Sequence, residues 1–536
     1  ISECLVGSEM CIRDRNTFND LHDVEALALW EWKETNTNWF MARRYYSTTS
    51  AIPELDRGDV DNMYNEGNSA VYKYGGLVGR LNYVYAGKYM AEFSFRYDGS
   101  YKTAPDKRWG FFPAVSAGWR ISEEQFMKDL VPQMDNLKLR ASWGSIGNDS
   151  QLNASQFVSG WQFEDRFILG GAGNSSASIT NGMKEANLAN PNITWYKVMT
   201  TNVGLDGSFW GGKLSFEFDY FYRKTTGYPA TRNTSLPTTS GIPLPQENLN
   251  SSDNRGFELS LGTVQRIGNV NLQIKGNVAY AREKDLYKEQ ALPLNQYKNW
   301  RDNGAYRWKN VTWGYEHIGQ FQSYDEIYNS PIQDGKGNSS LRPGDIKYKD
   351  LNGDGLIDAN DEKVIGKGTF PDLNFGLTLA ADWKGFDVNI LFQGASNYTQ
   401  VLNALTSPFR GPGEGNGFRV WMDSWHKADY NDPDSEWVPG KFPSLRIEGN
   451  DNNSKKSTYW TTDAYYVRLK SIEIGYTIPK NLLSKVGIEH LRVYANAYNP
   501  LTITNVKYTD PEAIEGWQSF YYPQLKVYSF GVNVSF

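Results

Sequence analysis

The chain has 536 residues, a formal net charge of −6, 15% aromatic residues and 50 glycines. This charge argues against nucleic acid as a partner, because nucleic-acid-binding proteins carry a basic patch or stripe. No apolar run approaches the roughly 18 residues of a membrane-spanning helix, so crossing a membrane by helices is excluded. Crossing by β-strands is not excluded, because barrel strands alternate in polarity and give no long apolar run.

The first fifteen residues, ISECLVGSEMCIRDR, differ in sequence pattern from the rest of the chain. They resemble translated sequencing-adapter DNA, and we expect residues 1–15 to be foreign to the protein. A genuine short N-terminal segment is the alternative. The stretch is not a signal peptide, because it lacks an apolar core of about 7–15 residues. Both cysteines, Cys4 and Cys11, lie here, so disulfide or thiol chemistry is not expected.

From residue 20 onward the recurring unit is a run of about ten residues that alternates in polarity. In 213–223, KLSFEFDYFYR, one face is apolar or aromatic and the other is polar. The aromatic face carries Leu214, Phe216, Phe218, Tyr220 and Tyr222. Successive side chains of a strand point to opposite faces, so each run predicts a two-faced strand.

About fifteen such strands are predicted. They cover 22–32, 36–46, 77–86, 88–97, 111–120, 136–145, 198–209, 213–223, 254–264, 271–282, 372–383, 385–394, 463–478, 489–498 and 526–536. The strands of a soluble β-sandwich would alternate in the same way. The lengths of the connections must therefore decide between a sandwich and a membrane barrel.

Short and long connections take turns along the chain. The short ones are 33–35, 86–88, 210–212, 264–269 and 384–385, and the longer 121–135 and 479–488 are expected to be small helical turns. The long ones are roughly 47–76, 146–197, 224–253, 283–371, 395–462 and 499–525. A bacterial outer-membrane barrel sorts its connections in this way, with short periplasmic turns and long extracellular loops. The sequence therefore predicts an antiparallel transmembrane β-barrel.

The stretch KDLNGDGLIDANDE, residues 349–362, has the ligand spacing of a calcium-binding loop. Side chains at positions 1, 3, 5, 9 and 12, and a backbone carbonyl at position 7, would bind the ion, with a glycine at position 6 for the turn. The candidate ligands are Asp350, Asn352, Asp354, Leu356, Asp358 and Asp361. Position 12 is aspartate instead of glutamate, and the adjacent Glu362 could substitute. The alternative is a metal-free turn held by Asx hydrogen bonds.

Enzymatic motifs are weak. The four histidines, at 22, 317, 426 and 490, show no metal-ligand spacing, and no GxSxG motif is present. We therefore expect no enzyme. Two predicted external segments, 299–317 and 410–426, are rich in aromatic residues. They could stack on sugar or peptide, but packing between loops, or against a partner, is the favoured interpretation.

Several stretches together resemble the SusC/RagA family of TonB-dependent outer-membrane transporters of Bacteroidota. They include GRLNYVYAGKYMAEFSFRYDGS (79–100), NLKLRASWGSIGN (136–148), GDIKYKDLNGDGLIDANDEKVIG (344–366) and AYYVRLKSIEIGYTIPKNLL (464–483). The resemblance runs through nearly all of 20–536 and rests on the order and spacing of these stretches.

The resemblance implies a barrel of 22 strands with an internal plug, in the outer membrane of a Gram-negative cell. It implies import of large nutrients, oligosaccharides or peptides, energised through TonB–ExbB–ExbD and closed by a SusD-like surface lipoprotein. No plug, TonB box or signal peptide is found in the sequence. We therefore expect 16–536 to be the C-terminal part of one barrel domain, about 15 of 22 strands, with 22–32 running towards the periplasm.

Two other functions stay open at this point. One is a passive porin or structural barrel without energy coupling. The other is a soluble calcium-dependent carbohydrate-binding β-protein. The sequence does not identify the substrate.

Overall fold

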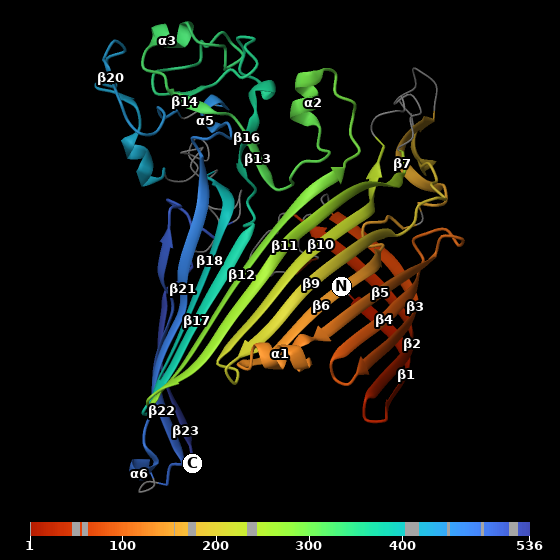
Figure 1. Cartoon of the computed structure of the whole chain (residues 1–536). Helices are drawn as coiled ribbons and strands as arrows, with labels where there is room; N and C mark the ends of the chain where they lie inside the picture. Colours follow the sequence, from red (N-terminus) through yellow and green to blue (C-terminus); the bar gives the residue numbers. More distant parts are fainter. Residues whose placement is uncertain are drawn as a thin grey trace.

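Figure 1 shows the computed structural model, an open curved sheet with a group of folded loops at one end. The structure describes residues 2–45, 54–55, 63–154, 156–169, 178–232, 244–402, 417–446, 451–483, 487–513 and 524–536. Among these residues the longest α-helix has seven residues, too short to span a bilayer.

The main sheet has fifteen antiparallel strands, each paired with the next along the chain. In order they are β1 (Ser2–Phe18), β2 (His22–Arg44), β3 (Met63–Tyr85), β4 (Tyr89–Ser100), β5 (Trp109–Arg120), β6 (Met134–Asn148), β9 (Tyr196–Phe209), β10 (Leu214–Thr231), β11 (Gln246–Ile267), β12 (Val270–Tyr287), β17 (Leu373–Trp383), β18 (Phe386–Val401), β21 (Thr461–Thr477), β22 (His490–Thr504) and β23 (Val527–Ser535). In the described residues β1 and β23 are edges, so the sheet is not closed. This agrees with the predicted incomplete barrel.

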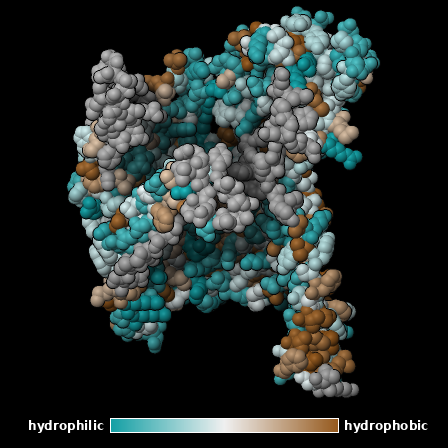
Figure 2. All heavy atoms as spheres, turned by 180° about the vertical axis from the view of Figure 1, so that it is seen from behind, coloured by the Kyte–Doolittle hydropathy of each residue, from teal (hydrophilic) through white to brown (hydrophobic). Residues whose placement is uncertain are grey.

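The two faces of the sheet differ in polarity. On β23 the side chains of Tyr528, Phe530, Val532 and Val534 share one exposed face. Ion pairs such as Arg140–Asp219 lie on the opposite face, here called the inner wall. Figure 2, turned by 180°, shows a hollow surrounded mainly by hydrophilic residues, and a hydrophobic patch at the projecting corner formed by β22 and β23. A wet interior and an apolar exterior are expected for a transmembrane barrel.

Short connections lie at one end of the sheet and long ones at the other (Figure 1). At the short end, Ala86 and Gly87 both have positive φ values, 51° and 68°, as a tight hairpin turn requires. The two longer connections at this end contain short helices, as predicted: η2 (Ile121–Glu123), α1 (Gln125–Leu130) and α6 (Lys480–Leu483).

The long connections carry the remaining elements. They are β7 (Gly160–Leu169), β8 (Ser178–Asn187), α2 (Gln296–Asp302), β13 (Val311–Gly314), β14 (His317–Gln320), α3 (Tyr324–Tyr328), β15 (Ile346–Tyr348), η4 (Ala359–Asp361), β16 (Lys363–Lys367), η5 (Arg419–Asp423), β19 (His426–Lys427), β20 (Trp437–Val438) and α5 (Asp451–Ser454). We call the part built from the described residues of 288–372 and 402–460 the cap.

The prediction was wrong at the start of the sheet. Residues 22–32 and 36–46 are not two strands, because β2 runs unbroken from His22 to Arg44. The supposed turn at 33–35 pairs with β3, with Lys33 opposite Tyr74 and Glu34 opposite Lys73. The fifteenth strand is β1, which pairs with β2 through a turn at 19–21. Residues 22–32 therefore run away from the short-turn end, opposite to the predicted direction.

Other strand boundaries differ as well. The connection predicted over 47–76 is shorter, because β3 begins at Met63. β10 and β11 continue beyond their predicted ends to Thr231 and Gln246, where they still pair. The pairing of β1 does not test whether residues 1–15 are foreign, and that stays a prediction.

Candidate functional site

The predicted calcium loop lies in the cap and is held by its own side chains. Asp350 accepts hydrogen bonds from the amides of Gly353 and Gly355 at 2.7 and 2.9 Å. Gly355 at position 6 has a φ of 80°, in agreement with the sharp turn predicted there. Asn352 and Asp354 each accept the amide two residues ahead, which is the Asx-turn pattern.

Asp361 closes the loop from its other end. Its side chain is fully buried, and its oxygens accept the amides of Leu351 and Asp358 at 2.8 and 2.9 Å. Asp358 caps η4 by accepting the amide of Asn360 at 2.7 Å. Ile357 belongs to the core of the cap. Asp361 therefore closes the loop, and Ile357 attaches it to the rest of the cap.

The donor set still suits a hard cation, because each carboxylate oxygen has a second lone pair beyond the amide that it accepts. Within the described residues, however, no group of three or more acidic, histidine or cysteine side chains is placed to hold an ion. As it stands, the loop has the geometry of the metal-free alternative. Calcium binding stays a prediction.

The cap has a hydrophobic core of its own, built from segments far apart in the sequence. Its members are Tyr315, Ile346, Tyr348, Ile357, Leu402, Trp421, Phe442 and Trp460. Lys455 Nζ lies 5.1 Å from the Tyr315 ring and donates to the Gln333 carbonyl at 2.8 Å. Burial lowers the pKa of Lys455, whereas burial and the carboxylates of Glu362, Asp358 and Asp361 raise the pKa of Tyr315 to about 12.

The aromatic residues of the segments 299–317 and 410–426 are divided between buried and exposed positions. Tyr315 is in the cap core, Trp421 and Trp425 are buried, and Tyr306 is 73% exposed. Trp308 lies over Arg282, with 4.4 Å from the guanidinium carbon to the ring centroid. Residues 410–416 of the second aromatic segment lie outside the described residues. The favoured packing interpretation is confirmed for the buried members only.

A polar hollow of about 1040 Å³ opens on the cap between residues of 324–342 on one side and 445–446 with 451–455 on the other. Asp334 lies on its wall and accepts amides from Lys336, Asn338 and Ser340 at 2.7, 2.8 and 2.9 Å. Burial alone would raise the pKa of Asp334, but these backbone donors lower it to about 2. The carboxylate therefore organises the turn that borders the hollow.

We expect this turn to loosen in acid. The pKa of Asp334 in the folded protein is lower than its ordinary value of about 3.9 in the unfolded chain. The stabilisation is therefore complete above that value and is lost as the pH falls towards 2. Amide hydrogen exchange at 336, 338 and 340, corrected for intrinsic rates, should speed up in this window and be fast at neutral pH in Asp334→Ala. Equal protection at pH 2 and 6, or an equal effect of replacing the exposed Asp325, would contradict this role.

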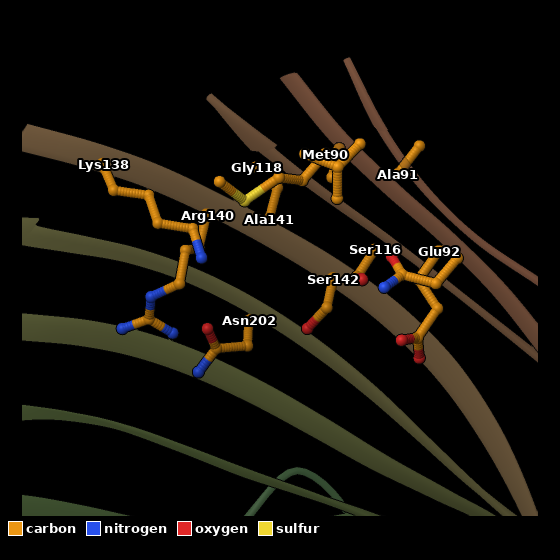
Figure 3. Close-up of a pocket in the computed structure, with 13 residues that line it drawn as sticks. Met90, Ala91, Glu92, Ser116, Gly118, Lys138, Arg140, Ala141, Ser142 and Asn202 are labelled. Atoms are coloured by element: carbon orange, nitrogen blue, oxygen red, sulfur yellow. The ribbon is translucent and has the colours of Figure 1, made fainter. Parts of the chain in front are cut away.

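The inner wall carries ion-pair groups in which one arginine lies between two carboxylates. They are Arg96 with Glu31 and Asp98, Arg140 with Asp206 and Asp219, and Arg492 with Asp387 and Glu473. Each group keeps one excess negative charge. Arg140 lines an inner-wall cavity of about 350 Å³. Lys138, Ser142 and Asn202 lie beside it (Figure 3). Glu92 and Asp219 are thus paired residues of the inner wall, Glu92 with Arg80 at 2.9 Å.

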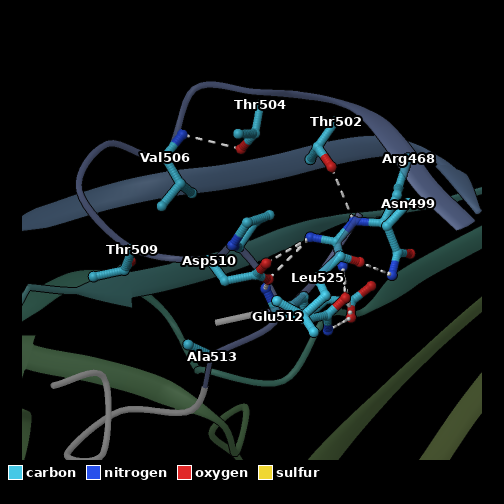
Figure 4. A network of polar contacts seen from close by, with 12 residues as sticks. Arg468, Asn499, Thr502, Thr504, Val506, Thr509, Asp510, Glu512, Ala513 and Leu525 are labelled. Atoms are coloured by element: carbon cyan, nitrogen blue, oxygen red, sulfur yellow. Dashed lines mark hydrogen bonds and ion pairs between the residues drawn. The ribbon is translucent and has the colours of Figure 1, made fainter. Parts of the chain in front are cut away.

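A second network attaches the last long connection to the wall (Figure 4). Arg468 of β21 is 2% exposed and binds Asp510 through both carboxylate oxygens at 3.0 and 2.8 Å. It also contacts Glu512 at 3.1 Å and donates to Gln524 and to Thr502. Tyr398 of β18 donates to the Pro511 carbonyl at 2.8 Å. The sequence analysis missed this network, because no local pattern joins residues 42 positions apart.

An antiparallel sheet with an apolar exterior, a charged inner wall, short turns at one end and folded loops at the other defines the wall of a transmembrane β-barrel. The profile of the family described as "TonB dependent receptor-like, beta-barrel" matches residues 11–500. The chain belongs to this family, which is one of outer-membrane transport receptors and not of enzymes.

Among similar proteins, TonB-dependent receptor P3 of Formosa agariphila is 27% identical over 99% of this chain and 54% of its own length. TonB-dependent receptor SusC of Bacteroides thetaiotaomicron is 26% identical over 85% of this chain and 43% of its own length. A solved structure of the RagAB peptide importer in the "open-open" state matches the whole chain with a TM-score of 0.76 at 20% identity, covering 55% of that chain. This last likeness shows the fold alone. The chain spans about half the length of these relatives.

Proposed function

We propose that this chain forms wall and outer loops of an importer for large hydrophilic nutrients, oligosaccharides or peptides, in the outer membrane. The observation that carries the proposal is the combination of the family match with a wide, charged inner wall. Ion-paired arginines, serines and asparagines keep such a wall wet, so a polar solute can pass without losing its hydration.

Energy would come through TonB, as the family name states for its members, and a SusD-like lipoprotein would close the outer mouth. The cap supports this partner because it is folded, with its own core, and presents exposed side chains such as Tyr306 and Tyr430. A passive porin is the second candidate. The membership in an outer-membrane receptor family removes the support for a soluble carbohydrate-binding protein.

The substrate class can be tested in the natural host by deleting the gene. Growth on defined oligosaccharide pools and on defined peptide pools as sole carbon source would be compared between deletion and parent strains. We expect growth on one class to be lost and to return with the intact gene. Unchanged growth on both classes would contradict the proposal.

We also propose that the loop 350–361 binds calcium and thereby stiffens the cap. In the intact protein, chelation should lower the melting temperature of the cap, and Asp350→Ala with Asp354→Ala should abolish the difference. The physical reason is that an ion bound only to the folded loop stabilises that state. Melting that is indifferent to chelator would leave the loop as a metal-free turn. Asp325→Ala, outside the loop, serves as the matched control.

A further inference from the structure

Strands β10, β11 and β12 are neighbours in the sheet (Figure 1). Their register places four cations together on the outward face. We call them the rim patch: Lys224, Arg255, Arg282 and Lys284. The strand register places them in two adjacent rows. Arg255 is opposite Tyr222 on one side and Arg282 on the other, while Asp253 is opposite Lys224 and Lys284. Directly paired residues point to the same face of a sheet, so the rows form one surface.

The rim patch continues the lipid-facing band. The next outward row towards the short-turn end, two residues from Arg255 and Arg282, holds Tyr220, Phe257 and Tyr280, which are also laterally paired. On β12 the outward positions from Leu272 to Tyr280 are apolar, aromatic or glycine, and the next two are Arg282 and Lys284. Eight residues span about 26 Å along a strand, or roughly 20 Å in height for a tilted strand, close to the apolar band of outer-membrane barrels. The patch thus begins where the hydrocarbon region ends.

Aromatic side chains accompany the cations. The segment 307–309 extends the sheet beside β12, with the amide of Asp285 donating to the Arg307 carbonyl and that of Lys309 to the Glu283 carbonyl. Trp308 forms an isolated antiparallel β-bridge with Lys284, so its side chain faces outward as well. Its ring lies 4.4 Å from the Arg282 guanidinium and 5.9 Å from Lys284 Nζ. Tryptophan and tyrosine concentrate at membrane–water interfaces, which agrees with this position.

The charges of the rim patch are not balanced by the protein. Arg255 pairs with Asp253 at 2.6 Å and Arg282 with Asp372 at 3.6 Å, and both carboxylates are buried beneath the surface. Among the described residues, neither Lys224 nor Lys284 has a carboxylate partner. Two lysines therefore present uncompensated positive charge beside two arginines whose planar guanidinium groups match phosphate oxygens.

We propose that the rim patch binds the phosphate groups of anionic lipid in the outer leaflet, such as the phosphorylated glycolipid lipid A. The apolar band below it contacts the acyl chains of the same molecule, Trp308 lies at the level of the head group, and the four cations surround its phosphates. Continuity with the lipid-facing surface favours a lipid over a protein partner. The site is independent of the solute that the barrel carries.

The test uses the intact protein in nanodiscs of phosphatidylcholine, with lipid A, phosphatidylglycerol or neither added. Lipid retained after detergent extraction is measured by native mass spectrometry for the parent and for Lys224→Gln with Lys284→Gln. These lysines are chosen because their loss leaves no buried carboxylate unpaired. Each cation near a charged membrane surface strengthens binding about fivefold. Removing two lysines should therefore lower lipid A retention about 25-fold in the double variant.

Lys138→Gln with Lys275→Gln removes the same charge from the inner wall and should leave retention unchanged. Retention that is equal in the parent and the rim variant would overturn the proposal. Displacement by inorganic phosphate without any lipid preference would show a simple anion site and would also overturn it. Loss of a co-purifying protein, with lipid retention intact, would assign the patch to a protein partner instead.

Discussion

Replacing Arg468 by alanine should release the last long connection from the inner wall while the barrel remains folded. Arg468 is almost fully buried and holds Asp510 and Glu512, the side chain of Gln524 and the hydroxyl of Thr502 at once. Removing one partner of a buried ion pair leaves the other charge unpaired, which costs about 3 kcal/mol or more. Because both carboxylate partners of Arg468 lie in the segment 505–513, the loss should appear as local opening of that segment.

The measurement is amide hydrogen exchange of 505–513 in the intact protein, together with limited proteolysis. Protection should fall by about two orders of magnitude, since 1.4 kcal/mol corresponds to a factor of ten. Arg80→Ala is the matched control, because its pair with Glu92 is 43% and 32% exposed and such surface pairs contribute about 0–1 kcal/mol. Unchanged protection of 505–513 in Arg468→Ala would show that Tyr398, Gln400 and the backbone hold the segment without the arginine.

Replacing Asp345 by alanine should unfold the cap without unfolding the sheet. Asp345 is fully buried, accepts the Asn453 side-chain amide at 2.8 Å and the Arg342 amide at 2.9 Å, and pairs with Arg446. Its loss would leave the Arg446 guanidinium, 11% exposed, without its counter-charge, at a cost of about 3–5 kcal/mol. The cap core is small, so this is a large fraction of its stability.

Tryptophan fluorescence reports the result, because Trp421, Trp425 and Trp460 are buried in the cap. The cap transition should move to lower temperature, with the strand signal of the barrel in circular dichroism unchanged. Glu326→Gln is the control, since its pair with Lys347 is 32% and 25% exposed. One shared transition that moves as a whole would show that cap and sheet unfold together and would contradict an independent cap.

The membrane-spanning wall could be predicted because one face of each strand contacts lipid and the other contacts water. This difference between the two faces produces the alternation of apolar and polar residues seen in 213–223 and 528–536. Beyond the apolar band both faces of a strand are wet, and the alternation disappears. That explains why the ends of β10 and β11, and the start of β3, were missed. The polar stretch at 33–35 looked like a turn for the same reason, although it pairs inside β2.

The cap could not be predicted in this way. Its core joins Tyr315 and Tyr348 of the connection 283–371 to Trp460 of the connection 395–462, and these residues follow no period. The loop 350–361 was located from its spacing alone, and its turn geometry at Gly355 agrees with the prediction. Its neighbours, including the bridge from Ile332 to Leu356, carry no signal in the sequence. Contacts between distant segments decide both the cap and the Arg468 network.

Energised uptake is the most direct test of the central claim. Cells that carry the intact gene are given labelled substrate of the class found by the deletion experiment, and uptake is measured with and without a protonophore. We predict that uptake requires the gene, that the substrate accumulates inside the cell above its external concentration, and that uptake stops when the proton motive force collapses. Gene-dependent uptake that continues unchanged with the protonophore would show a passive channel and contradict the account.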